Sequence, residues 1–209
     1  MTEYDFRDMI AGYVEEQAKS GLYYEWSSAL NKLIDKYNAY PNIGRGIQYK
    51  PSLGGWCALY ASVPFIILGM ADLIQPEIGA YEMEANAKKA GIFKKRTSGY
   101  VPKRGDLIHY SYPRKKEDGT PFQQFHVGIV TNSDDVWCYS TEGNVEHRVM
   151  MRAAKNWAAD TTITGFSAID YASKVKDAPE LPDMPAEFGN YILTATVTET
   201  YKKIKWQKT

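Results

Sequence analysis

The chain has 209 residues, of which 44% are hydrophobic and 24% charged, a profile typical of one globular domain with a modest extension. Lys plus Arg and Asp plus Glu number 25 each, so we expect no long-range attraction to nucleic acid. The longest apolar run, residues 61–70, contains Pro64 and falls far short of the roughly 20 residues that span a bilayer. We therefore expect no nucleic-acid partner and no transmembrane segment.

Aromatic residues are plentiful, with sixteen Tyr and five Trp. Most of them are expected in the core, but surplus Tyr near a cleft suits stacking on sugars or on flat peptide groups. The N-terminus runs directly into a helical pattern, without the basic stretch and apolar core of a signal peptide. Either the protein is made without a signal, or a signal was removed.

The first half of the chain is expected to be helical. Apolar residues at helical spacing predict an amphipathic helix at the N-terminus and a second helix that ends before Pro41. A strongly apolar helix is expected from about Trp56 to Met70, kinked or shortened by Pro64, and a weaker one from Glu77 to Ala90. The spacing of the first two helices is carried by Phe6, Met9, Ile10, Tyr13 and Val14, and by Trp26, Leu30, Leu33, Ile34 and Tyr37.

The pattern changes to short β-branched and aromatic segments after Gly99. Helices followed by antiparallel strands indicate an α+β domain, with the helices packed on a sheet of five to six antiparallel strands. We place this domain at residues 1–175, with a helical part at 1–95 and a sheet part at 100–172. The expected strands are Asp106–Tyr112, His126–Thr131, Val136–Thr141, Glu146–Met151 and Ile163–Tyr171.

The C-terminal segment has a different composition. Residues 176–190 carry Pro179, Pro182 and Pro185 among polar residues, which is typical of a linker. Residues 191–209 show some strand alternation but are too few to bury a core of their own. They form either a terminal arm on the main domain or the start of a truncated second domain.

Cys57 is the strongest candidate for a nucleophile. It follows Gly54 and Gly55 and opens the apolar helix, so the first N–H groups of the helix point toward its sulfur. A helix N-terminus and a neighbouring imidazolium both favour the thiolate, which is the attacking species. The backbone N–H of Cys57 is a natural oxyanion donor, and Gln48 is a weaker candidate for a second one. Cys138 lies in the middle of an expected strand and is interpreted as a buried hydrophobic residue.

His126 is the best placed of the three histidines to act as a base. It opens an expected strand after a long polar loop, which is a rim position, and Gly128 lets a substrate or another backbone approach the same face. His109 lies within a strand and His147 beside Arg148, so both are expected to be structural or exposed.

The partner of His126 is expected on the next strand. A hairpin turn at residues 132–135 would pair Thr131 with Val136, which places His126 opposite Thr141. A loop or bulge that differs by one residue shifts that partner to Glu142. Glu142 and Asn144 share a strand face, and one of them is expected to bond the far nitrogen of the His126 ring.

Four ordered motifs resemble the CHAP domains, the cysteine, histidine-dependent amidohydrolases/peptidases that are distant relatives of papain. The resemblance covers roughly Ala29 to Tyr171, and residues 163–166 also fit the closing strand of that family. The motifs are Trp56-Cys57-Ala58, Pro102-Lys103-Arg104-Gly105-Asp106-Leu107-Ile108, His126-Val127-Gly128-Ile129-Val130 and Thr141-Glu142-Gly143-Asn144.

The resemblance implies a papain-like fold and cleavage of an amide bond in bacterial peptidoglycan, in the stem peptide, the cross-bridge or the muramoyl-alanine linkage. It makes Cys57 the nucleophile, His126 the base, Glu142 the orienting residue and Asn144 a further polar contact. Trp56, Gln48 and Gly128 are expected to contact the substrate. We expect no metal and no other cofactor. Pro64 and the charged insert at residues 113–124 depart from the family pattern, and the insert is a candidate wall of the substrate site.

Three functions remain open from the sequence. The first is a bacteriolytic hydrolase that acts at the bacterial cell wall, released by a phage or prophage route if the protein lacks a signal. The second is a thiol amidase or acyltransferase on other amides inside the cell. The third is a catalytically silent wall-binding module of the same fold. The oligomeric state is not predicted.

Overall fold

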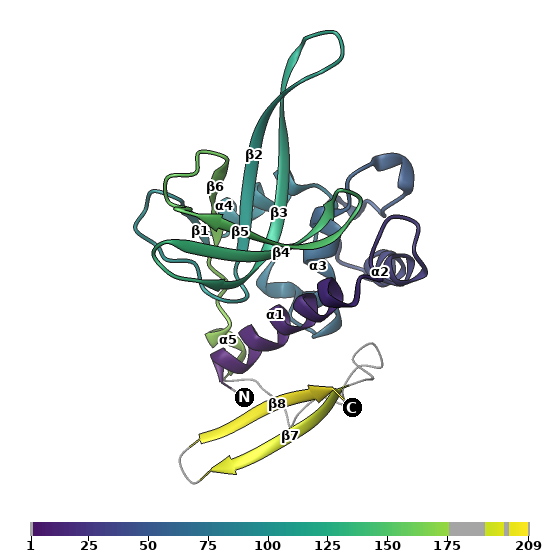
Figure 1. Ribbon diagram of the computed structural model, residues 1–209. Helices are drawn as coiled ribbons and strands as arrows, with labels where there is room; N and C mark the ends of the chain where they lie inside the picture. The colour runs from purple at the N-terminus through teal and green to yellow at the C-terminus, as the bar shows by residue number, and fades with distance from the viewer. Residues whose placement is uncertain (1, 176–190, 199–200, 209) are drawn as a thin grey trace.

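The computed structural model describes residues 2–175, 191–198 and 201–208, and its main part is an α+β arrangement of helices on one six-stranded antiparallel sheet (Figure 1). The strand order is β1-β6-β2-β3-β4-β5. The helices are α1 (Glu3–Ser20), α2 (Ser28–Ala39), α3 (Cys57–Ile67), α4 (Ala80–Lys89) and α5 (Ala172–Val175). The strands of this sheet are β1 (Phe93–Lys95), β2 (Leu107–Lys115), β3 (Pro121–Ser133), β4 (Trp137–Val145), β5 (Arg148–Lys155) and β6 (Ile163–Ser167).

The sequence prediction of an α+β domain with antiparallel strands is therefore confirmed. The short strand β1 was not predicted, and it pairs with β6 at the edge of the sheet. The expected linker at 176–190 lies outside the described residues. Residues 191–208 include two strands that pair as an antiparallel hairpin, β7 (Tyr191–Thr198) and β8 (Tyr201–Lys208).

Local signals place the first two helices. Thr2 and Asp5 form a capping box at the start of α1, and Gly21 ends that helix in the left-handed conformation. The hydroxyl of Ser27 caps α2 by accepting from the N–H of Leu30. Trp26, which was assigned to this helix, lies before the cap instead, exposed to solvent and with a φ of 67°.

Helix α3 begins at the expected residue but ends earlier than expected. Its last turn contains Pro64, and a Schellman motif follows, because Gly69 has a φ of 67° and the N–H of Met70 bonds the carbonyl of Phe65. The helix is buried along nearly its whole length and packs against β3 and β4. It therefore brings its first residue, Cys57, to the sheet.

Successive side chains of β3 pack into two separate hydrophobic clusters. Odd-numbered residues of β3, such as Val127 and Ile129, pack with the helices, whereas Val130 belongs to a second cluster with Trp157 and Phe166 on the opposite face. His126 lies beside Tyr110 of the second cluster, with 5.8 Å between the centroids of the two rings, and it also contacts Cys57 of the main core.

The segment expected as a loop before His126 is part of a long β-ribbon. Strands β2 and β3 pair from Leu107↔Ile129 to Lys115↔Pro121, so His126 lies within β3 and does not open it. The outer part of this ribbon projects beyond the rest of the sheet (Figure 1). The insert that departs from the family pattern is therefore an ordered extension of two strands that carry the site.

The pairing of β3 with β4 also differs from the prediction. Gly128 faces Glu142, and a bulge lies between Val130 and Asn132. The turn is shorter than expected because the side chain of Asp134 accepts hydrogen bonds from the N–H groups of Val136 and Trp137. The pairing expected for Thr131 with Val136 is wrong for this reason.

A buried ion pair joins α1 to the sheet. Asp106 has no exposed surface and accepts hydrogen bonds from Arg7 at 2.8 Å, from the Tyr100 hydroxyl at 2.5 Å and from two backbone N–H groups. Arg7 also donates to the carbonyls of Arg104 and Ile169. The Pro102–Ile108 motif thus has a structural role, because Asp106 within it anchors the first helix.

We predict that Asp106→Ala destabilises the fold strongly. It removes the buried carboxylate from the Arg7 guanidinium, which keeps only the partly exposed Glu3 as a partner, and breaking a buried pair typically costs about 3–5 kcal/mol. Chemical denaturation followed by circular dichroism measures the free energy of unfolding. Asp35→Ala, at an exposed position on α2, is the matched control. A loss below about 1 kcal/mol for Asp106→Ala would contradict the anchoring role.

Candidate active site

Cys57 is the first residue of α3 and is 7% exposed. The turn before it depends on Gly54, which has a φ of 82° that residues with a side chain rarely adopt. The free N–H groups of the first helical turn surround this position. The sulfur is thus placed where backbone dipoles favour a negative charge.

His126 connects Cys57 to Glu142. Its Nε2 lies 2.9 Å from Oε2 of Glu142, and its ring lies near enough to the Cys57 side chain for this interaction to raise the pKa of His126. Because a carboxylate only accepts hydrogen bonds, Nε2 carries a proton, and Nδ1 is the nitrogen that remains for the thiol. The three side chains expected to act together are therefore in contact.

These contacts perturb both ionisable partners. Burial lowers the pKa of His126, but the hydrogen bonds and charges of Cys57 and Glu142 outweigh it and raise this pKa from 6.5 to about 10. Burial raises the pKa of Glu142, but His126, Arg152 and Ser140 lower it from 4.5 to about 2. At neutral pH the site therefore holds an imidazolium against a carboxylate.

Two glycines leave the space that this arrangement of Cys57, His126 and Glu142 requires. A Cβ on Gly128 would lie 2.5 Å from Cγ of Glu142, so the space opposite this carboxylate exists only because residue 128 has no side chain. A Cβ on Gly143 would lie 2.6 Å from Cβ of Tyr60 and 2.9 Å from Cζ3 of Trp56. Gly143 thus lets β4 approach the first turns of α3, where Cys57 lies.

Glu142 has no exposed surface and has four hydrogen-bonding side chains around it. Oε1 accepts from the Tyr110 hydroxyl at 2.7 Å and from the Ser140 hydroxyl at 2.6 Å. Oε2 accepts from His126 at 2.9 Å and from Arg152 at 3.0 Å. A buried carboxylate with this many donors is held in one orientation.

Tyr110, Ser140 and Arg152 were not predicted from the sequence. Tyr110 pairs with His126 across β2 and β3, and Ser140 pairs with Arg152 across β4 and β5. These pairings set the register of β2 with β3 and of β4 with β5, and neither register was predicted from the sequence. Strand alternation could have identified Ser140 from the sequence, because Ser140 and Glu142 are two residues apart on one strand and therefore share a face.

Asn144 is not bonded to His126. It has a φ of 59°, and a Cβ on Gly55 would lie 3.1 Å from its Nδ2, so its amide lies against the loop that precedes Cys57. Glu142 and Asn144 were the two candidates for the partner of His126, and it is Glu142 that hydrogen-bonds the ring. Asn144 instead adjoins the backbone on the nucleophile side of the site.

The three residues expected to bind substrate have other contacts. Trp56 is 1% exposed and packs edge-on against Tyr60, so its side chain belongs to the core. Gln48 is exposed, and its amide donates to the carbonyl of Asn38 at the end of α2. The space next to Gly128 is filled by the Glu142 side chain.

The remaining histidines and cysteine take no part in this site. His109 is buried and hydrogen-bonded to Ser167, and burial lowers its pKa to about 4. His147 is exposed and bonds Glu25. Burial raises the pKa of the Cys138 thiol to about 12, which keeps it protonated and unreactive. His109 and Cys138 are thus buried structural residues and His147 is exposed, as the sequence indicated.

We predict that Gly128→Ala lowers the pKa of His126, because the added methyl group displaces the Glu142 carboxylate that stabilises the imidazolium. NMR titration of the ring protons measures this pKa directly. Gly12→Ala, where a Cβ meets its nearest atom at 3.8 Å, is the matched control and should leave the pKa near 10. An unchanged titration in Gly128→Ala would contradict the steric argument.

The same titration has a consequence for stability. The folded-state pKa of His126 lies above its value of 6.5 in the unfolded chain. Protonation of His126 therefore stabilises the fold fully below about pH 6.5, and this contribution is lost as the pH rises toward 10. The loss should be smaller in Gly128→Ala than in the Gly12→Ala control.

A scan against protein-family models and a search of curated proteins both found no match to this chain. Among residues 2–175, 191–198 and 201–208, the structure contains no helix with the length and apolar character needed to cross a membrane. What the protein does must therefore be inferred from the geometry of the site.

Proposed function

We propose that the protein is a cysteine hydrolase that cleaves an amide bond in bacterial peptidoglycan. The observation that carries this proposal is the continuous contact from Cys57 through His126 to the buried Glu142. A thiol at a helix N-terminus, a histidine and an orienting carboxylate are the parts that thiol-dependent acyl transfer requires.

The proposed reaction begins with attack of the Cys57 thiolate on the carbonyl carbon of the amide. The carbonyl π bond opens to an oxyanion, which the backbone N–H of Cys57 stabilises. His126 then gives its proton to the leaving nitrogen as the C–N bond breaks, which leaves a thioester on Cys57 and a free amine. His126, now neutral, takes a proton from water, the resulting hydroxide attacks the thioester, and collapse releases a carboxylic acid and restores the Cys57–His126 pair.

Glu142 acts as a positioning residue in this scheme. It holds the Nε2–H of His126 and therefore directs Nδ1 toward the sulfur. Tyr110, Ser140 and Arg152 hold Glu142 in turn. The proton transfers thus occur at one ring nitrogen, while the other remains bonded throughout.

The substrate class is supported by the resemblance of the four motifs to CHAP domains, and the papain-like fold is proposed on the same basis. The described architecture is compatible with that fold, since a helix with Cys57 at its N-terminus packs against the strands that carry His126 and Glu142. The β2–β3 ribbon continues outward from His126 and is the proposed wall of the substrate site. The proposed place of action is the bacterial cell wall.

We predict that Cys57→Ala abolishes the release of new amino and carboxyl termini from purified cell walls, with a loss of at least about a thousandfold. Mass spectrometry of the digest identifies the bond that is cut. Glu142→Ala should reduce the rate by about a hundredfold, since orientation contributes less than the nucleophile. Cys138→Ala is the matched control and should retain activity. Cleavage of peptide substrates but not of cell walls would instead support an amidase on other amides.

A second prediction separates an enzyme from a silent module of the same fold. Iodoacetamide at pH 6 should alkylate Cys57 but not Cys138, because only Cys57 lies at a helix N-terminus beside an imidazolium. Peptide mapping by mass spectrometry measures the two sites in one sample. In His126→Gln the labelling of Cys57 should slow at least tenfold. Equal, slow labelling of both cysteines would contradict an activated thiol.

A further inference from the structure

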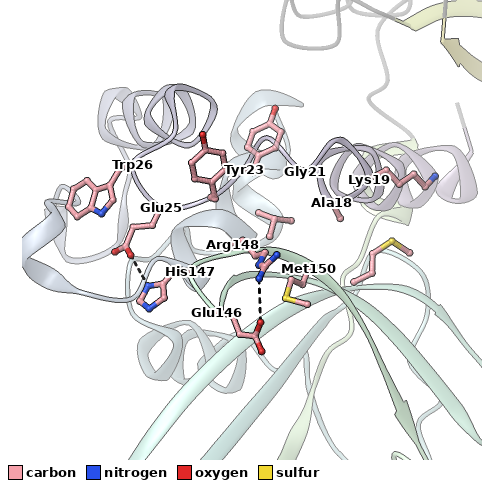
Figure 2. Close-up of a pocket in the computed structure, with 13 residues that line it drawn as sticks. Ala18, Lys19, Gly21, Tyr23, Glu25, Trp26, Glu146, His147, Arg148 and Met150 are labelled. Carbon is pink, nitrogen blue, oxygen red and sulfur yellow. Dashed lines mark ion pairs between the residues drawn. The ribbon is translucent and has the colours of Figure 1, made fainter.

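A hollow lies beyond the end of β4, and Cys57, His126 and Glu142 are not among the residues that line it. Figure 2 shows the lining residues. The hollow has a volume of about 700 Å³, which lies within the range of small-ligand sites. Its walls are the end of α1, the loop between α1 and α2, the β4–β5 turn and the start of β5. The turn begins two residues after Asn144, so this hollow adjoins the segment that borders the loop before Cys57.

The walls of this hollow are rigidly joined. The N–H of Glu25 bonds the carbonyl of His147 at 2.7 Å, and the N–H of Val149 bonds the carbonyl of Tyr23 at 2.8 Å. The carboxylate of Glu25 also lies 2.7 Å from Nδ1 of His147. A dashed line in Figure 2 marks this pair. The loop thus pairs with the turn like a short edge strand, and the hollow is preformed.

Trp26 has an unusual backbone conformation for a bulky residue. Its φ is 67°, in the left-handed region that favours glycine, and its side chain is 67% exposed, so no core packing accounts for this conformation. Glu146 and His147 also have positive φ, but they are the two central residues of the turn between Val145 and Arg148, where positive φ is the ordinary conformation. The outlier in the lining of this hollow is therefore Trp26, and backbone outliers of this kind cluster at ligand sites.

The chemistry of the lining fits a neutral ligand with both apolar and polar faces. The lining carries two cations, Lys19 and Arg148, and two carboxylates, Glu25 and Glu146, so its formal charge without the histidine is zero. Glu146 lies 3.6 Å from Arg148, and Glu25 lies 2.7 Å from Nδ1 of His147. These pairs retain donors and acceptors at the surface for hydroxyl and amide groups. Trp26 and Tyr24 add exposed aromatic surface, which can stack on the C–H face of a sugar ring.

We propose that this hollow, lined by Trp26, Glu25, Glu146, His147 and Arg148, binds a neutral saccharide, namely the glycan strand of the peptidoglycan substrate. The proposal rests on the proposed function for the identity of the polymer. It assigns sugar binding to one side of the enzyme and amide cleavage to the Cys57 site, linked by the end of β4. Glycan binding would hold the polymer while the attached peptide enters the catalytic site.

The test is calorimetric titration with a β-1,4-linked tetramer of N-acetylglucosamine, in a Cys57→Ala background that prevents any hydrolysis. The tetramer should bind, and Trp26→Gly should weaken binding at least about tenfold, which corresponds to the loss of one aromatic stacking contact. The melting temperature of Trp26→Gly should be unchanged or higher, because glycine accepts the positive φ without strain. Weaker binding in an equally stable variant separates a ligand contact from a structural role.

Tyr4→Ala is the matched control, since Tyr4 is an exposed aromatic residue in the first turn of α1, about 20 Å from the hollow at the other end of that helix. Its affinity should stay within about twofold of the background protein. Absence of tetramer binding, equal binding by Trp26→Gly, or displacement of the tetramer by a stem peptide would overturn the inference. Cell-wall cleavage is scored separately with the wild-type protein, so failure of the proposed function is distinguishable from failure of the glycan site.

Discussion

The Glu142 carboxylate is the group on which the arrangement of this protein depends. An ionised carboxylate without exposed surface is strongly destabilising unless donors surround it, and the donors of Glu142 come from β2, β3, β4 and β5. One buried charge thus requires four neighbouring strands to be in register. A slip of one residue in any of them would remove a donor and leave a charge uncompensated.

The approach of α3 to the sheet determines whether this charge can serve chemistry. Gly143 lets β4 contact the helix closely, and Gly128 leaves room for the Glu142 side chain. The helix begins at Cys57, so the same packing brings the sulfur at its N-terminus to the ring of His126. Burial lowers the pKa of His126, but the interactions with Cys57 and Glu142 outweigh it and raise this pKa to about 10.

The end of β4 connects the Cys57 site to the hollow that Trp26 lines. Asn144, with a φ of 59°, lies against the loop before Cys57, and the regular pairing of β4 with β5 is interrupted between Glu142 and Val145. Glu146 and His147 then form the turn to β5 and line the hollow together with Trp26. The proposed amide cleavage and the proposed sugar binding therefore take place at the two ends of this one segment.

The sequence by itself determined features that depend on neighbours in the chain. Helical spacing located α1, α2 apart from Trp26, and the start of α3, and alternation with turn residues indicated the antiparallel strands and the α+β class. Cys57, His126 and Glu142 were also singled out from the sequence, and the structure places these three side chains together. Only the tertiary structure decided the β3–β4 register, the ordered β2–β3 ribbon, the donors Tyr110 and Arg152, and the burial of Trp56. The physical reason is that sequence periodicity reports only the preferences of neighbouring residues. The pairing of β3 with β4 depends instead on a bulge and on the turn that the Asp134 side chain stabilises. The donors that surround the buried Glu142 carboxylate are likewise distant from one another in the chain.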